Sequence, residues 1–392
     1  MMLLLQSATD SGLREGLMAL NRGDIAGARA SLELAATREP KNAIVWAALA
    51  RVYYQAGLKD KAVAGAEHAA ELDPENPAIQ HALAMFYQSM DEPGKAANYE
   101  RKYSKSPNAD RAAGVRAARL YMGAADPVAA AEVALDALRY ANLASLHNIL
   151  GQALEAQKLA PGALKEYREA SLLEPENQEY RFGLVQALFR TERFAEAAAL
   201  LESAVKDQPD SAQYQLALGV AYYGLRRFDE ALQAFLKTID LSPDTEQPYL
   251  FLAKMLDQAG GGLPAIETRF EQYRKRFPEG YLGSFLMAKA LLYGDPGSPR
   301  IEILLRETIS RKPDLWEAHA DLSDRLSRKK DYRNSANELE IAAKLNPLEP
   351  SIPFRLARIF DRLQQSEKAS EQRALHEKLL AGSTRGMGKT AP

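Results

Sequence analysis

Residues 175–208 spell PENQEYRFGLVQALFRTERFAEAAALLESAVKDQ, and residues 209–242 spell PDSAQYQLALGVAYYGLRRFDEALQAFLKTIDLS. Both segments are 34 residues long, both begin with a proline, and Pro243 follows the second one. The same step of 34 residues separates Pro40 from Pro74. A period of roughly 20–50 residues is typical of proteins built from stacked structural units. The spacing therefore predicts a repeat protein and not a series of compact globular domains.

Each unit divides into two halves whose apolar residues have helical spacing. In the second quoted segment, Leu218, Gly219 and Tyr222 lie in the first half, and Ala231 and Phe235 lie in the second half. Apolar positions three, four and seven residues apart form one face of an α-helix. A proline cannot continue a helix, and it disfavours the helical conformation in the residue before it. Each unit is therefore predicted to be two helices joined by a short turn.

The residue types at fixed places carry a family resemblance. Trp46, Leu49 and Tyr53 stand in the first half of one unit, and Ala62 and Ala69 in its second half. This order resembles the tetratricopeptide repeat, and the resemblance covers roughly residues 9–381. It implies an all-α, right-handed superhelical solenoid of about eleven tandem helix-turn-helix repeats, or about 22 helices. The units are expected to begin near Thr9, Ala43, Pro77, Arg111, Ala144, Gln178, Ala212, Glu246, Leu282, Trp316 and Pro350.

The two ends and some inner units depart from the pattern. Residues 1–8 are expected to be an N-terminal stub or the remnant of a truncated export signal. Residues 382–392 have no periodicity, so we expect a disordered tail. The fourth unit lacks its closing proline near Asn142, and the eighth carries Gly260-Gly261-Gly262 at its inner turn. From Pro243 to Pro313 the chain has 70 residues, two more than twice 34, so small insertions lie there. Two interpretations stay open for these insertions: ordinary loop variation, or a hinge or lip that serves a partner.

The composition excludes several classes of protein. There are 50 Lys and Arg against 52 Asp and Glu, and the charges are mixed, without the basic stripe of a nucleic-acid binder. The chain has no cysteine, which excludes disulfides, thiolate catalysis and Cys-ligated metal sites. No apolar run approaches the roughly 20 residues of a membrane helix. We expect no nucleic acid and no integral membrane segment. The compartment stays open, cytoplasmic by default and exported if residues 1–8 belong to a signal.

Three fragments resemble enzyme motifs, and each lacks a necessary part. Gly382 and the run Gly388-Lys389-Thr390 have neither the glycine spacing nor the following helix of a phosphate-binding loop. His376-Glu377 would need a second histidine where the chain has Leu380 to form a zinc-protease motif. Gly260-Gly261-Gly262 lacks the spacing of a dinucleotide fingerprint. We therefore predict no enzyme activity, no cofactor and no metal.

The resemblance also implies where a partner would bind. In this family the second, fifth, ninth and twelfth positions of a unit face the concave groove, and the partner is a protein or a peptide. These positions mix aromatic anchors with hydrogen-bonding groups, as interface hot spots do. For Phe182 and Phe189, packing against neighbouring units remains the alternative. The predicted partner-binding residues are Arg51, Tyr54, Asn148, Gln152, Phe182, Gln186, Phe189, Tyr223 and Lys254.

The leading hypothesis is a non-catalytic interaction scaffold that holds a peptide or a helix in the concave groove. Two alternatives remain. The chain could be an architectural component of a cell-envelope or secretion assembly, or a non-catalytic fragment of a larger enzyme.

Overall fold

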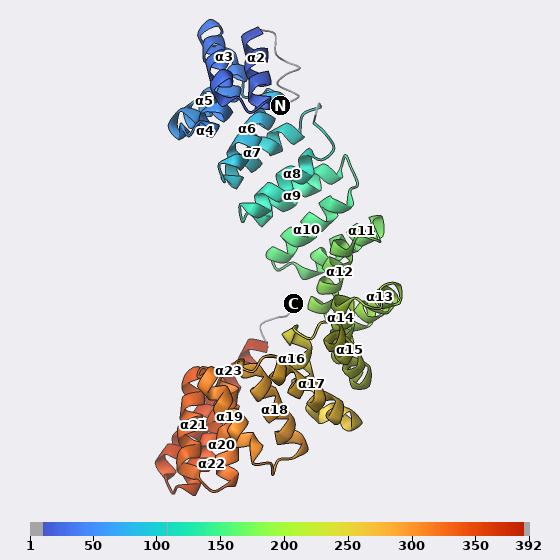
Figure 1. Cartoon of the computed structure of the whole chain (residues 1–392), viewed down its shortest axis with the longest axis vertical. Helices are drawn as coiled ribbons and strands as arrows, with labels where there is room; N and C mark the ends of the chain where they lie inside the picture. The colour runs from blue at the N-terminus through green and yellow to red at the C-terminus, as the bar shows by residue number, and fades with distance from the viewer. Residues whose placement is uncertain (1–10, 108, 388–392) are drawn as a thin grey trace. The chain divides into compact units, whose positions relative to one another are not determined.

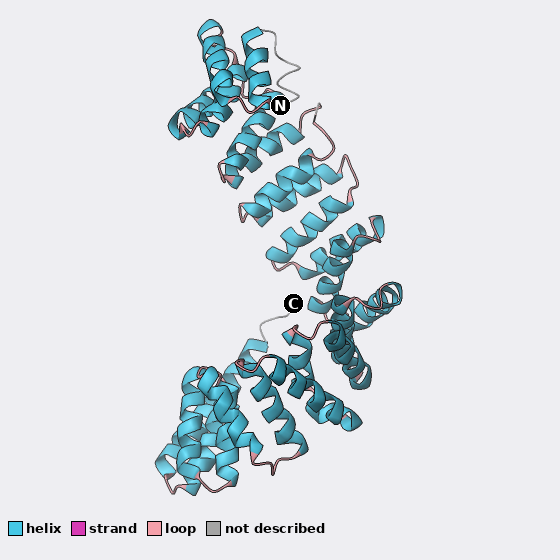
Figure 2. Ribbon diagram, in the orientation of Figure 1, coloured by secondary structure: helices cyan, strands magenta, loops and turns pink. Residues whose placement is uncertain are grey.

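The protein consists of helices throughout the part of the chain that the structure describes. A computed structural model describes residues 11–107 and 109–387, with side chains up to Ala381. These residues form 22 α-helices and two short 3₁₀-helices, and they contain no strand (Figure 2). The prediction of an all-α helical repeat is confirmed. The predicted N-terminal stub, residues 1–8, lies outside the described residues.

The chain divides into two compact units, Met1–Arg193 and Phe194–Pro392, and each is considered by itself. In Figure 1 the first unit runs from blue to green and the second from green to red. The helices of the first unit are α2 (Ser11–Asn21), α3 (Ile25–Arg38), α4 (Ala43–Gln55), α5 (Lys59–Leu72), α6 (Pro77–Ser89), α7 (Pro93–Ser104), α8 (Ala113–Gly123), α9 (Pro127–Leu138), α10 (Ala144–Ala156), α11 (Ala160–Leu173) and α12 (Gln178–Arg190).

The helices of the second unit follow the same plan of a first and a second helix per repeat. They are α13 (Phe194–Asp207), α14 (Ala212–Gly224), α15 (Phe228–Leu241), α16 (Glu246–Lys254), α17 (Leu263–Arg276), α18 (Tyr281–Gly294), α19 (Arg300–Arg311), α20 (Trp316–Arg328), α21 (Tyr332–Leu345), α22 (Ser351–Arg362) and α23 (Ser366–Met387). The 3₁₀-helices Leu256–Gln258 and Gly260–Gly262 occupy the turn between α16 and α17. The glycine run therefore lies in an inter-helix turn, where no strand precedes it.

Small residues let the two helices of a repeat approach each other closely. Gly219 of α14 faces the ring of Phe235 of α15, and a Cβ built on Gly219 would lie only 2.6 Å from that ring. Phe235 itself is fully buried. A larger residue at position 219 would therefore push the two helices apart. In α5, Ala62, Ala66 and Ala69 serve the same purpose and are completely buried.

In nine repeats the turn between the two helices is closed by one residue in the left-handed conformation. After α14, Arg226 has a φ of 60°. Its N–H donates to the carbonyl of Tyr223 (3.0 Å), and the N–H of Arg227 donates to that of Tyr222 (2.9 Å). These two bonds form the Schellman motif that ends many helices. Glycine adopts this conformation without cost, yet only two of the corresponding turns use it. The residues at this place are Gly23, Gly57, Asp91, Ala125, Lys158, Glu192, Arg226, Lys330 and Gln364.

At six of the linkers between repeats in the described residues, a side chain donates a hydrogen bond to the carbonyl of the closing proline. In each of these six bonds the donor is the side chain six residues later, on the first helix of the next repeat. The chemical identity of the donor varies, but the acceptor and the spacing do not. The bonds run from Trp46 to Pro40 (2.9 Å), Gln80 to Pro74 (2.9 Å), Arg181 to Pro175 (2.6 Å), Gln215 to Pro209 (3.2 Å), Tyr249 to Pro243 (2.9 Å) and His319 to Pro313 (3.0 Å).

Three histidines on first helices pair with glutamates on the second helix of the same repeat. The Nδ1 atoms lie 2.7–2.9 Å from the carboxylates, and each pair is separated by 19 residues in the sequence. The pairs are His81–Glu100, His147–Glu166 and His319–Glu338. His319 also contacts the Pro313 carbonyl through Nε2, so both ring nitrogens face acceptors. The hydrogen bond with Glu338 is the main cause that raises the pKa of His319, and burial opposes it.

The last helix extends into the segment that we expected to form a tail. We expected a disordered tail from residue 382, but α23 continues to Met387. The physical reason is that extending an existing helix fixes one residue for each new hydrogen bond, and no proline interrupts the chain before Pro392. Residues 388–392 lie outside the described residues. Up to Ala381, most of α23 is exposed, with Ala369 fully buried, which suits the polar end of a repeat array.

The proline-carbonyl bond predicts the effect of removing a single hydroxyl. Tyr249→Phe keeps the buried ring and deletes only the donor to Pro243. We expect the variant to lose about 1 kcal/mol of unfolding free energy, the net contribution of a typical hydrogen bond. Urea unfolding followed by circular dichroism measures this. The matched control is Tyr140→Phe, whose ring is 88% exposed and which should leave the midpoint unchanged. Equal behaviour of the two variants would show that the bond contributes nothing.

His319 predicts a pH-dependent contribution to stability. Because its pKa is raised in the folded chain, the contribution is fully present below the ordinary histidine pKa, about 6.5. It is lost as the pH rises through the raised value. His319→Gln removes the titration but keeps a donor for Pro313, since glutamine already fills this place at Gln80 and Gln215. Urea midpoints measured from pH 5.5 to 8.5 should show a wild-type advantage that shrinks with rising pH. An advantage that is constant or grows with pH contradicts the assignment.

Candidate functional site

The first helices of successive repeats contact one another and form a common face. Direct contacts join α2 to α4, α4 to α6 and α8 to α10 in the first unit, and α16 to α18 in the second. Residues three or four apart on one helix lie on the same side of it. The ninth and twelfth positions of each unit, counted from the unit starts given above, lie on its first helix, so pairs such as Arg51 and Tyr54 of α4 are side by side. We call these positions the first-helix face.

On α4, one predicted residue is already part of the connection between repeats. The hydroxyl of Tyr54 donates to the carbonyl of Ser89 at 2.9 Å, and its ring meets Phe86 edge-on at 6.1 Å. Both partners belong to the next repeat. Arg51 is half-buried and makes no ion pair within the described residues. Arg51 therefore keeps its charge available, whereas Tyr54 holds α4 against α6.

On α10, the two predicted residues differ in the same way. Asn148 is only 4% exposed, and its Nδ2 donates to Glu179 of α12 at 2.9 Å. Gln152, one turn later, is half-buried and lines a cavity of about 500 Å³ together with Glu155, Ala187 and others. Asn148 thus stabilises the stacking of two repeats, and Gln152 faces open space.

On α12, the predicted residues form one stripe. Phe182, Gln186 and Phe189 are spaced four and three residues apart, which places them on one side of the helix. Gln186 is exposed, and both phenylalanines are half-buried. The stripe therefore offers a polar group between two partly accessible aromatic rings.

In the second unit, the predicted residues surround one phenylalanine. Tyr223 of α14 lies edge-on to Phe251 at 5.6 Å and to Phe228 at 6.0 Å. Lys254 of α16 is exposed, with its Nζ 5.8 Å from the Phe251 ring, a favourable cation–π distance. Tyr223 is half-buried by these contacts. Its ring is therefore held in place before any partner arrives.

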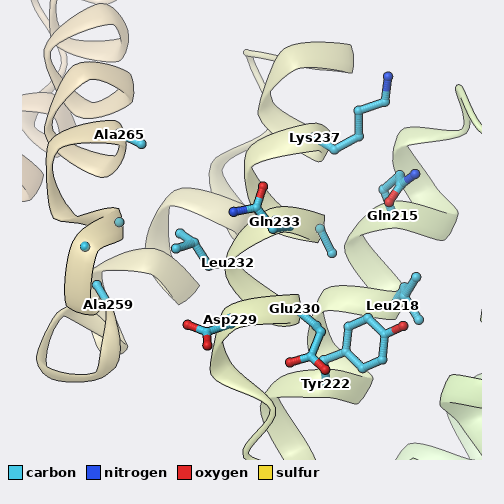
Figure 3. A pocket seen from close by; sticks show the side chains of 13 residues that line it. Gln215, Leu218, Tyr222, Asp229, Glu230, Leu232, Gln233, Lys237, Ala259 and Ala265 are labelled. Carbon is cyan, nitrogen blue, oxygen red and sulfur yellow. The ribbon is translucent and has the colours of Figure 1, made fainter.

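The second unit also contains a larger cavity, of about 940 Å³, away from these residues. Figure 3 shows its lining side chains, from Gln215 of α14 across Gln233 of α15 to Ala265 of α17. Tyr223 and Lys254 do not line it. Most of its polar groups come from the second helix α15, so it belongs to a different surface from the predicted site.

The described residues contain neither a metal-ligating cluster nor a membrane-spanning helix. No three His, Cys, Asp or Glu side chains there are grouped so that they could hold a metal ion. No helix in that part of the chain is both long and apolar enough to cross a membrane.

Two stretches of the sequence match the tetratricopeptide repeat family, residues 19–86 and residues 182–245. Together with the regular helix pairs described above, these matches support a tetratricopeptide repeat protein. Proteins of this family bind proteins or peptides and act as interaction scaffolds.

Several solved structures are similar to the chain. The complex of Naa15 and Naa10 bound to HypK is 14% identical, with 92% of this chain and 67% of the other covered and a TM-score of 0.47. Yeast Tom70 is 17% identical, covers 95% and 94%, and gives 0.46. YrrB, described as a repeat protein with an unusual peptide-binding site, is 22% identical, covers 47% and 95%, and gives 0.40. No curated protein sequence matches the chain significantly.

The contacts of the predicted residues separate stabilising from accessible positions. Asn148→Ala removes a buried amide and its hydrogen bond to Glu179, so we expect a loss of about 1–3 kcal/mol in unfolding free energy. Gln186→Ala, an exposed glutamine on the next first helix, should change it by less than about 0.5 kcal/mol. Chemical denaturation of both variants measures the difference. If the two lose the same stability, Asn148 does not hold the repeats together.

Proposed function

We propose that the chain is a non-catalytic scaffold that binds an extended peptide or a helix of a partner protein on its first-helix face. The matches to the tetratricopeptide repeat family support a protein or a peptide as the partner. The observation that carries the proposal is the ninth-position row of the first unit. One exposed or half-buried side chain from each of five successive first helices lies in it: Arg51, Met85, Arg119, Gln152 and Gln186.

The chemistry of this row suits a peptide. It contains two arginines, Arg51 and Arg119, and no acidic side chain, and neither arginine has an ion pair within the described residues. Met85 is 45% exposed, which is high for a large apolar side chain, and methionine adapts to varied partners. Beside the row, Phe182 and Phe189 supply rings whose positions are already fixed by partial burial, which lowers the entropy lost on binding.

The architectural alternative is favoured by a different observation. Val128 and Leu135 of the second helix α9 are 54% and 52% exposed, and Leu172 of α11 is 68% exposed. Val128 and Leu135 are seven residues apart, so they share one side of the helix. A structural assembly could use such a second-helix surface instead. The enzyme-fragment alternative receives no support from any arrangement in the described residues.

Site-directed photocrosslinking distinguishes the two surfaces. A photoreactive amino acid at Gln186 reports on the first-helix face, and the same amino acid at Lys165, exposed on the second helix α11, is the matched control. We expect a partner to be captured from position 186 and not from position 165. Capture from position 165 alone would place the interface on the second helices and contradict the proposal.

The captured partner then allows a quantitative test. Phe189→Ala should weaken binding by about 2 kcal/mol, or roughly thirtyfold, as aromatic hot spots do. Leu135→Ala truncates an exposed apolar residue of the second-helix surface and should leave the affinity unchanged. Titration calorimetry gives both values, with circular dichroism to verify folding. The reverse result, a loss with Leu135→Ala only, supports the architectural alternative. If Phe189→Ala lowers stability and not affinity, this ring packs and does not bind.

A further inference from the structure

The spacing between repeats changes at one place in the first unit. Four residues separate α3 from α4, α5 from α6, and α11 from α12. Eight residues, 105–112, separate α7 from α8, and five, 139–143, separate α9 from α10. Insertions in repeat proteins gather on one face, often a binding face. These are two consecutive linkers between repeats, so the irregular spacing is concentrated at one place in the first unit.

The long linker precedes α8, and α8 also lacks the side chain that would donate the usual hydrogen bond to a proline carbonyl. The first helix of this repeat carries Gly114 at the place that elsewhere holds Trp46, Gln80 or Arg181. Glycine has no side chain to donate. In the following repeat the closing proline is absent, and His147 contacts the side chain of Asn142 at 2.7 Å instead. Neither linker is therefore connected in the regular way.

The two linkers enclose a cavity of about 640 Å³, which we call the linker pocket. Its walls come from the end of α7, both linkers, the first turn of α8 and the face of α9 that carries Val133 and Ala137. The charged and aromatic groups that line it include Arg101, Lys105, Arg111, Asp136, Arg139 and Tyr140. None of the residues of the first-helix face lines it.

The linker pocket carries excess positive charge. Asp110, which also lines it, is held by both terminal nitrogens of Arg116 at 2.8 and 2.9 Å. The hydrogen bond from Arg116 lowers the pKa of Asp110, so this carboxylate stays ionised and neutralises that arginine. Asp136 lies 3.7 Å from Arg139.

Two other cations of the pocket have no such compensation. Lys105 and Arg111 are exposed, and no ion pair within the described residues involves either of them. Arg101, in contrast, is paired with Glu132 at 3.1 Å. The cations that remain for a ligand are therefore Lys105 and Arg111, one at each end of the long linker.

An exposed aromatic ring stands at the same pocket. Tyr140 is 88% exposed, the highest value among the exposed large apolar and aromatic side chains of the described residues. Pro107, Val133 and Ala137 add apolar wall beside it. A tyrosine ring and free cations in one cavity are the composition of an interface hot spot that takes an anionic partner.

We propose that the linker pocket is a second protein-binding site, which takes an acidic peptide segment containing one large apolar residue. Carboxylates of the segment pair with Lys105 and Arg111, and its apolar side chain covers Tyr140. The site is separate from the first-helix face, because its walls are linkers and a second helix. It therefore does not depend on the proposed function of that face.

The test uses the full chain and fluorescence anisotropy with a fluorescein-labelled peptide Glu-Glu-Trp-Glu-Glu. We expect saturable binding that weakens with added salt. Lys105→Ala combined with Arg111→Ala should weaken it at least about tenfold, and Tyr140→Ala severalfold. The charge-matched control is Arg22→Ala combined with Lys41→Ala, two exposed cations of the same unit, which should leave binding unchanged.

Four results would overturn the proposal. The first is no saturable binding of the probe. The second is equal weakening by both double variants, which shows attraction to net charge alone. The third is undiminished binding of Gln-Gln-Trp-Gln-Gln, which removes the role of the carboxylates. The fourth is full displacement by equimolar inorganic phosphate, which indicates a site for small anions. Phe189→Ala should not affect the probe, so a failure of the first-helix proposal is distinguished from a failure here.

Discussion

The carbonyl of the closing proline, and the side chain that donates to it, is the interaction on which the regular stacking depends. A proline ends the second helix, and its carbonyl then lies beside the start of the next first helix with no intrahelical partner. A polar backbone group packed between helices needs a hydrogen bond. Because the donor in all six of these bonds comes from the residue six places later, each bond fixes where the next helix lies. Trp46, Gln80 and Tyr249 satisfy the same acceptor with an indole, an amide and a phenol.

The acceptor could be read from the sequence, but the donor could not. The prolines and the spacing of apolar residues were sufficient to predict eleven pairs of helices, because both features repeat in residue type. The donors share only the ability to donate, so no residue type marks them. The left-handed turn residue could not be predicted for the same reason. Asp91, Ala125 and Lys158 have this conformation, and only a glycine there would have indicated it in the sequence. What repeats there is a backbone conformation and not a side chain.

The candidate site shows a similar division between what a repeat pattern determines and what it leaves open. Helical geometry assigns Asn148, Gln152 and Gln186 to one face from their positions within a repeat. It does not say which of them a neighbouring repeat already uses. Asn148 bonds Glu179, 31 residues away, and Tyr54 bonds the Ser89 carbonyl, 35 residues away. Such bonds depend on how neighbouring repeats are aligned with each other, and the pattern of apolar residues within one repeat does not determine this alignment.

In this architecture, a regular stack of repeats leaves little room for a single site that differs from its neighbours. Where every linker has four residues and every closing carbonyl has its donor, each repeat presents its residues at equivalent positions, and a partner must be recognised by the sum of many similar contacts. The linker before α8 differs from the regular linkers. Gly114 has no side chain that could donate to the closing carbonyl, and the eight residues of this linker are long enough to form walls of a pocket. Within this linker Asp110 is held by Arg116, which in turn is held by the buried Glu100. Lys105 and Arg111 have no ion pair within the described residues, so the irregular linker offers charged groups for the compact site that we propose there.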